Sequence, residues 1–189
     1  MSLLLGLVLA AASPAAAPPP AARLPAPAAR TIVEADGTRT LVNEVIVDAP
    51  AASVWRAVST PEGWMGWAVP LARMVGEDLL ETSYDPGTAI GGPSTIRQLF
   101  VARIPGRMIA FRTVRAPEGF PDFDTYARVV NVIELVPLGE RRTLVRLTAS
   151  PYPDTAAGRR LLAFFSRGNA ATLADLRRLF AREPARRRR

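Results

Sequence analysis

The stretch Val45-Ile-Val-Asp-Ala-Pro-Ala-Ala-Ser-Val-Trp55-Arg-Ala-Val-Ser-Thr-Pro-Glu62 decides the fold. It opens on the end of a β-branched, extended segment, residues 40–47, which Asp48-Ala-Pro50 stops. The Asp of this tripeptide suits the N-cap of a helix over residues 51–58, and its Pro suits the first turn. Ser59-Thr60 can cap a second short helix. The stretch therefore predicts a strand followed by two short helices.

Turn residues divide the next part of the chain into short extended segments. Because the turns between them are short, the segments should pair as antiparallel hairpins. A long helix follows over residues 155–182, with an apolar stripe that needs a partner surface. The order predicts an α+β fold, a curved antiparallel sheet of six or seven strands around the C-terminal helix. The expected strands after the first are residues 71–75, 79–84, 94–102, 108–115, 126–136 and 143–150.

Both ends of the chain differ in composition from this domain, which we place at residues 38–182. Leu3 to Ala12 is an apolar run too short for a bilayer but typical of a signal peptide, and an Ala/Pro-rich spacer follows it. Residues 1–30 are thus predicted as signal peptide and linker, and residues 183–189 as a disordered, arginine-rich tail. We expect a periplasmic or secreted protein with no membrane span in the mature chain; the alternative is a low-complexity cytosolic leader.

The composition excludes several kinds of chemistry. The 189 residues include no cysteine and no histidine, and all 24 basic residues are arginine. Thiolate, imidazole and lysine catalysis are therefore absent, and we expect no metal and no cofactor. The net charge is +7, but residues 36–182 carry only about +3 of it. A nucleic-acid partner is accordingly not expected.

Together with this order of elements, residues 45–62 resemble the SRPBCC superfamily of START-like, or helix-grip, domains. Further likeness lies in Pro105-Gly-Arg-Met-Ile-Ala-Phe-Arg112, in the hairpin 132–147, in residues 83–93 and in residues 164–176. The most similar branch is that of exported proteins related to activators of the heat-shock chaperone ATPase. The resemblance implies a cavity between sheet and long helix, which members of the superfamily use for lipids, sterols and polyketides.

Candidate cavity residues follow from the pattern and the resemblance. The two tryptophans after the first helix line an entrance or belong to the core. The loop 116–125, with two aromatic and three acidic residues, is a lid or an ordinary hairpin loop, and it lacks the spacing of an EF-hand. The full set is Trp64, Trp67, Tyr84, Gln98, Phe100, Arg112, Phe120, Phe123, Asn131, Glu134 and Phe165.

Two interpretations of the polar candidates remain open. Glu134 and Arg146 could form a cross-strand ion pair on a hairpin. Alternatively, Arg112, Asn131 or Glu134 points into the cavity and orients a polar group of a ligand.

Three functions are consistent with the sequence. The chain is a non-catalytic carrier or sensor of a small hydrophobic molecule, a cyclase or hydrolase that uses tyrosine and carboxylate groups, or a protein-interaction module of the cell envelope. We favour the first function, because a binding cavity needs no nucleophile.

Overall fold

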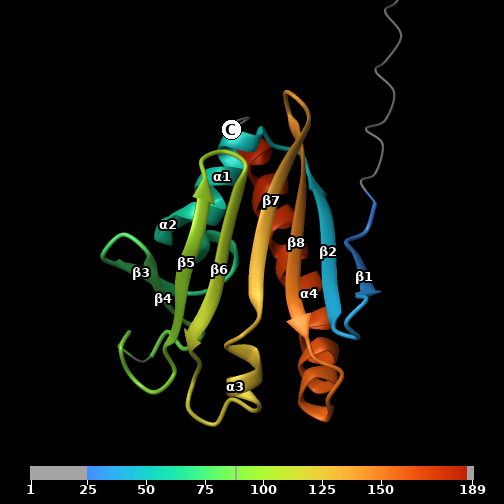
Figure 1. Cartoon of the computed structure of the whole chain (residues 1–189). Helices are drawn as coiled ribbons and strands as arrows, with labels where there is room; N and C mark the ends of the chain where they lie inside the picture. Colours follow the sequence, from blue (N-terminus) through green and yellow to red (C-terminus); the bar gives the residue numbers. More distant parts are fainter. Residues whose placement is uncertain (1–24, 88, 187–189) are drawn as a thin grey trace, which may run out of the picture.

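The computed structural model describes residues 25–87 and 89–186. Its strands and helices follow the predicted order, an α+β arrangement with a long C-terminal helix (Figure 1). The predicted signal peptide and most of the arginine-rich tail lie outside the described residues. The elements are β1 (Ala28–Val33), β2 (Arg39–Val47), α1 (Ala51–Ser59), α2 (Pro61–Trp67), β3 (Leu71–Val75), β4 (Leu79–Ser83), β5 (Ile96–Ile104), β6 (Met108–Arg115), α3 (Phe123–Tyr126), β7 (Val130–Gly139), β8 (Arg142–Tyr152) and α4 (Ala156–Arg186).

The strands form one antiparallel sheet in the order β1-β2-β8-β7-β6-β5-β4-β3. Its eighth strand, β1, corrects the predicted boundary, because residues 28–30 belong to the sheet and not to a linker. All six residues of β1 are exposed, so no alternation of apolar and polar residues marks the strand in the sequence. Pairing with the edge of β2 holds it instead.

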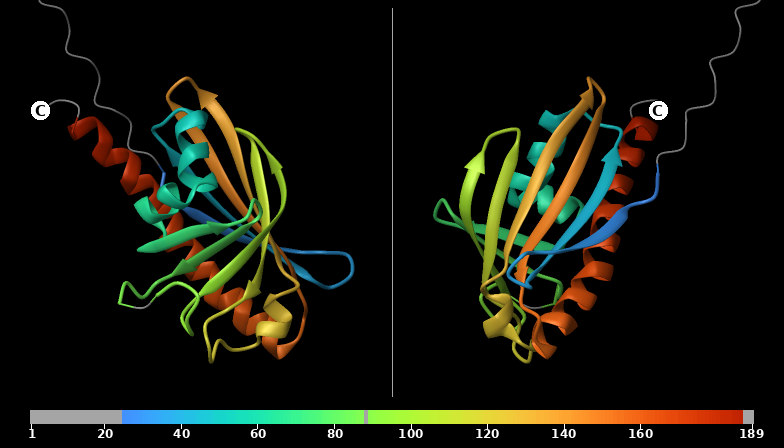
Figure 2. Two further views of the ribbon diagram at one scale, coloured as in Figure 1. Left: turned by 90° about the vertical axis from the view of Figure 1, so that its left-hand side faces the viewer. Right: turned by 45° about the vertical axis from the view of Figure 1, so that its right-hand side comes forward.

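The sheet curves around α4, which lies along its concave face (Figures 1 and 2). Register shifts in the β2–β8, β5–β6 and β7–β8 pairs accompany this curvature. Helices α1 and α2 cover one end of the same face. The helix-grip architecture predicted from the sequence is confirmed.

The starts of the two short helices test the capping predictions. Thr60 caps α2, because its hydroxyl accepts a hydrogen bond from the Gly63 N–H at 3.0 Å. Asp48 does not cap α1. The N-cap is Pro50, so Asp48 lies two residues too early to accept from the first turn.

The interior between the sheet and the helices divides into two apolar clusters. The upper cluster gathers α1, α2, the end of α4 and the middle of the sheet around Trp64, Phe111 and Phe180. The lower cluster surrounds Tyr126 and Tyr152 near the start of α4. No helix of the described residues is both long and apolar enough to cross a membrane.

Candidate functional site

Between the two apolar clusters, polar side chains cross the concave face of the sheet. Asn43 of β2 is fully buried and Asn131 of β7 is 5% exposed. Thr113 of β6, which is also buried, pairs in register with Gln98 of β5. Asn169, near the middle of α4, adds a further amide. These five residues are called the amide band.

Several atoms of the amide band have no hydrogen-bond partner among the described residues. Asn43 reaches α4, where its Nδ2 donates to the Ser166 carbonyl at 3.5 Å, but its Oδ1 has no partner. The Oε1 atom of Gln98 and the Nδ2 atoms of Asn131 and Asn169 are also buried without partners. An unsatisfied buried polar group costs about 1–3 kcal/mol. Most buried polar atoms in proteins are hydrogen-bonded, to protein or to ordered water, so a bound molecule that completes these atoms would be stabilised.

Tyr126 joins the amide band to the lower cluster. Burial raises the pKa of this phenol, while Thr113 and Asn131, which lie beside its hydroxyl, oppose the rise. The phenol therefore stays protonated at neutral pH and can donate a hydrogen bond. Tyr126 ends the short helix α3, where the sequence pattern predicted the start of a strand; β7 begins only at Val130.

Aromatic side chains close the lower end of the site. Phe165 of α4 stacks on Tyr126, with ring centroids 4.4 Å apart. Phe120, from the loop before α3, contacts both of these rings and also the ring of Phe164. Phe123 packs against the same cluster. The aromatic residues of loop 116–125 therefore pack on α4.

An ion pair holds this loop to the helix. Both Arg160 nitrogens Nε and Nη2 donate to the Asp122 carboxylate, at 3.0 and 2.8 Å. Asp122 adopts a left-handed backbone conformation with φ of 56°. Within the described residues, no cluster of acidic side chains could hold a metal ion. The acidic residues of this loop thus include an anchor to α4.

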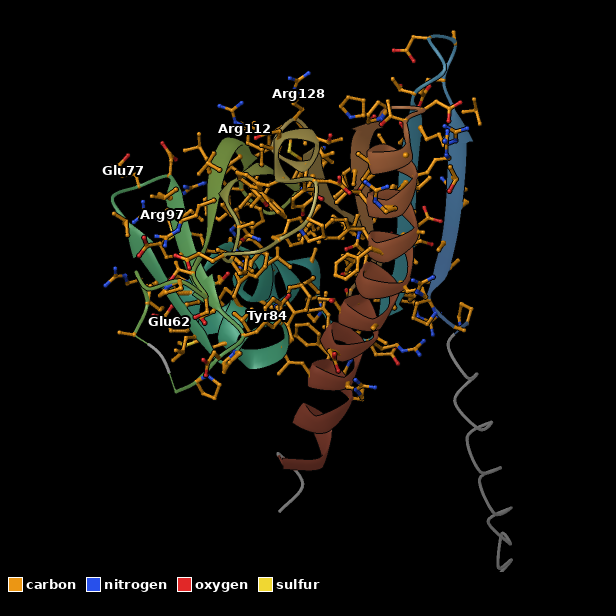
Figure 3. All side chains as sticks on the ribbon, turned by 90° about the horizontal axis from the view of Figure 1, so that it is seen from below. Glu62, Glu77, Tyr84, Arg97, Arg112 and Arg128 are labelled. Atoms are coloured by element: carbon orange, nitrogen blue, oxygen red, sulfur yellow. The ribbon has the colours of Figure 1, made fainter. Side chains whose placement is uncertain are left out.

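One flank of α4 is open beside the amide band. On helical spacing, Gly168 lies on the flank that also carries Phe164, which contacts the loop, and Leu179, whose methyl groups would be 3.7 Å from a Cβ atom placed on Gly66 of α2. A Cβ atom on Gly168 would meet nothing within 4 Å. Tyr84, at the end of β4, is 64% exposed and lies between the sheet and α4 when the molecule is viewed from below (Figure 3).

The remaining aromatic candidates belong to the core. Trp64 is 7% exposed and donates its Nε1–H to the Val58 carbonyl at 2.8 Å. Trp67 is half-buried and donates to the Ala57 carbonyl at 2.9 Å. Phe100 is buried in the upper cluster. Of the two interpretations of the tryptophans, the structure supports the core.

Arg112 and Glu134 do not face the interior, which corrects their prediction as cavity residues. Arg112 lies between the buried Phe111 and Thr113, so strand alternation points it to solvent (Figure 3). Glu134 is paired in register with Arg146, and their charged atoms lie 3.7 Å apart on the convex face. The cross-strand ion pair is therefore the correct interpretation of this hairpin.

The sequence prediction missed three members of the amide band. Asn43, Thr113 and Asn169 were not candidates, although the first was visible in the pattern. Asn43 has the same strand parity as Val45 and Val47, so it had to point inward with them.

Comparisons with known proteins agree with this architecture. Similar solved structures include protein MLL2253 from Mesorhizobium loti, with 22% identity, a TM-score of 0.60 and coverage of 76% of this chain and 98% of that chain. The Aha1 dimer from Colwellia psychrerythraea matches with 15% identity, a TM-score of 0.58 and coverage of 75% and 95%.

Norcoclaurine synthase from Thalictrum flavum, solved with dopamine and hydroxybenzaldehyde, matches with 16% identity, a TM-score of 0.52 and coverage of 77% and 84%. At these identities the likeness concerns the fold. No curated protein matches the chain. Residues 38–181 match the family described as polyketide cyclase/dehydrase and lipid transport. The chain therefore belongs to this family, within the SRPBCC superfamily.

Proposed function

We propose that this protein binds a small hydrophobic molecule between the sheet and α4 and does not transform it. The observation that carries the proposal is the amide band, whose buried atoms without partners lie between two apolar clusters. Apolar walls with a few convergent polar groups are typical of small-molecule sites. The family description, which includes lipid transport, supports the same function.

A non-catalytic role is supported by the side chains that face the interior. Glu81 is the only charged residue among the buried described ones, and Arg73 and Arg97 hold its carboxylate on the opposite face of the sheet. Tyr126 is thus left without a buried carboxylate that could act as its partner in acid–base chemistry.

Export is part of the proposal. The apolar run at residues 3–12 and the Ala/Pro-rich spacer support a signal peptide, and a carrier or sensor in the periplasm or outside the cell would follow. Intact-mass analysis of the protein from its native envelope fraction tests this. A chain shortened at its N-terminus is expected, whereas a full-length chain in the cytosol would contradict export.

Native mass spectrometry of protein purified from its own source tests the binding function. We expect a non-covalent adduct of lipid-like mass that disappears on mild denaturation. The variant Asn131→Leu should lose most of the adduct, while Arg112→Gln, on the convex face, should keep it. A consistently empty protein would contradict the proposal and favour the protein-interaction module, which a pull-down from the envelope fraction would then examine.

The buried phenol of Tyr126 favours one second candidate, a cyclase. In that case Tyr126→Phe would abolish turnover of a bound substrate and leave its binding intact. If the molecule recovered from the wild type and from Tyr126→Phe is chemically the same, no transformation takes place and the carrier function stands.

A further inference from the structure

The partnerless atoms of the amide band include both donors and acceptors. Among the described residues, Asn43 and Gln98 each leave an oxygen without a partner and Asn169 leaves its N–H₂ group, while the N–H₂ group of Asn131 has only the Tyr126 hydroxyl beside it. Three of these residues come from separate strands, and Asn169 faces them from α4. A ligand that satisfies this set must itself accept and donate hydrogen bonds.

The amide band contains no charge that could balance a charged ligand. Of the 24 arginines in the chain, none within the described residues is buried, so a carboxylate or phosphate in the interior would have no cation to pair with. Glu81 is the one buried anion among these residues, and two arginines already neutralise it on the far face. Transfer of an unpaired charge from water to such an interior is strongly unfavourable.

The groups next to the amide band are aromatic and neutral. Tyr126 keeps its proton because burial raises its pKa, and its ring stacks on Phe165. Phe120 completes this surface. Flat aromatic rings pack well on such a surface, and a hydroxyl on the ligand's ring would point towards the amides.

We propose that the interior selects uncharged aromatic molecules that carry hydroxyl or carbonyl groups, and that it rejects fatty acids and other anionic lipids. This inference rests on the proposed binding function. It narrows that function, because the amide band supplies hydrogen bonds without any compensating charge.

Three probes of similar shape test the two parts of the proposal separately: the preference for a polar group and the rejection of a negative charge. Titration calorimetry near neutral pH compares 2-naphthol, which is neutral and hydroxylated, with 2-naphthoate, which is anionic, and with naphthalene, which has no polar group. We expect 2-naphthol to bind about tenfold more tightly than either of the others, a difference of about 1.4 kcal/mol. Binding of 2-naphthoate as tight as that of 2-naphthol would overturn the inference.

The variant Asn131→Leu checks that the amides cause the selectivity. It should bind naphthalene as well as the wild type does and should lose the preference for 2-naphthol. Gln98→Leu provides an independent second variant if Asn131→Leu does not fold. Equal binding of all three probes to the wild type would be consistent with a hydrophobic site, but it would refute the proposed preference for neutral, hydroxylated aromatic molecules. If no probe binds and the native protein is empty, the binding function itself fails.

Discussion

The rings of Tyr126 and Phe165 lie stacked, with centroids 4.4 Å apart and an angle of 16° between their planes. This pair connects α3 to α4. It lies next to the amide band, on the side of the lower cluster. The phenol stays close to Asn131 because the ring is fixed from below. The same stacked pair therefore covers the lower end of the site and fixes the position of the Tyr126 hydroxyl.

Loss of the Phe165 ring should destabilise the protein. Phe165→Leu removes the stacking on Tyr126 and leaves space in the lower cluster, so the free energy of unfolding should fall by about 1–2 kcal/mol. Denaturation in urea measures this change. Phe164→Leu is the matched control, because Phe164 is 56% exposed, and its effect should be less than half as large. Equal effects would show that the stacking adds no stability.

Position 168 should tolerate a side chain, and a large side chain there should slow the entry of a ligand into the site. Gly168→Ala should raise stability by about 0.5–1 kcal/mol, since alanine favours the helix and its Cβ meets no atom within 4 Å. Gly168→Trp should fold and yet bind 2-naphthol more slowly, because the larger ring covers the open flank. Stopped-flow mixing measures the association rate. An unchanged rate in Gly168→Trp would place the entrance elsewhere.

The ion pair between Asp122 and Arg160 should hold the loop closed. Arg160→Gln removes both hydrogen bonds to the carboxylate, so amide hydrogens in α3, such as those of Thr125 and Tyr126, should exchange faster with deuterium. Arg159→Gln serves as the control, because Arg159 pairs with Asp154 and not with the loop. Similar exchange in both variants would argue against an anchoring role for Arg160.

Glu81 should make the stability depend on pH. Its burial alone would raise its pKa, but Arg73 and Arg97 outweigh this and lower the pKa below the ordinary value. The stabilisation is therefore present above the pKa of an unfolded glutamate and is lost as the pH falls through the lower folded-state value. Arg97→Gln should raise the pKa of Glu81, so acid should destabilise this variant at a higher pH.

Thermal melts between neutral and acidic pH measure this shift. Arg142→Gln is a control, since the ion pair of Arg142 within the described part of the chain is an exposed contact of 3.5 Å with Asp48. If the pH of the acid transition is the same in Arg97→Gln as in the wild type, Arg97 does not lower the pKa of Glu81.

The sequence predicted the fold better than it predicted the site. Turn residues and extended, β-branched segments specified β3 to β6 and β8 within about two residues, and β6 and β8 also show the alternation of a strand that buries one face. β1 was missed because it buries neither face. The start of β7 was placed too early, at residue 126, because the α3 turn depends on packing against α4, which no local pattern encodes.

For the site, residue type was a weaker guide than strand parity. Arg112 and Glu134 looked functional because they are charged, but the pleat points both outward. Asn131, on the same strand as Glu134, and Gln98 of β5 have the parity of buried apolar neighbours, Ile133 and Phe100, and so face the interior. Asn169 could not be placed from the sequence alone, since its role follows from the rotation of α4 against the sheet.

The side-chain amide resonances of Asn43 and Asn131 provide the most direct test of the central claim. Titration of isotopically labelled protein with 2-naphthol should shift the N–H₂ signals of both residues, while the guanidinium signal of Arg112 on the convex face should not move. Shifts confined to the convex face, or amide signals unchanged at saturating 2-naphthol, would contradict a ligand site between the sheet and α4.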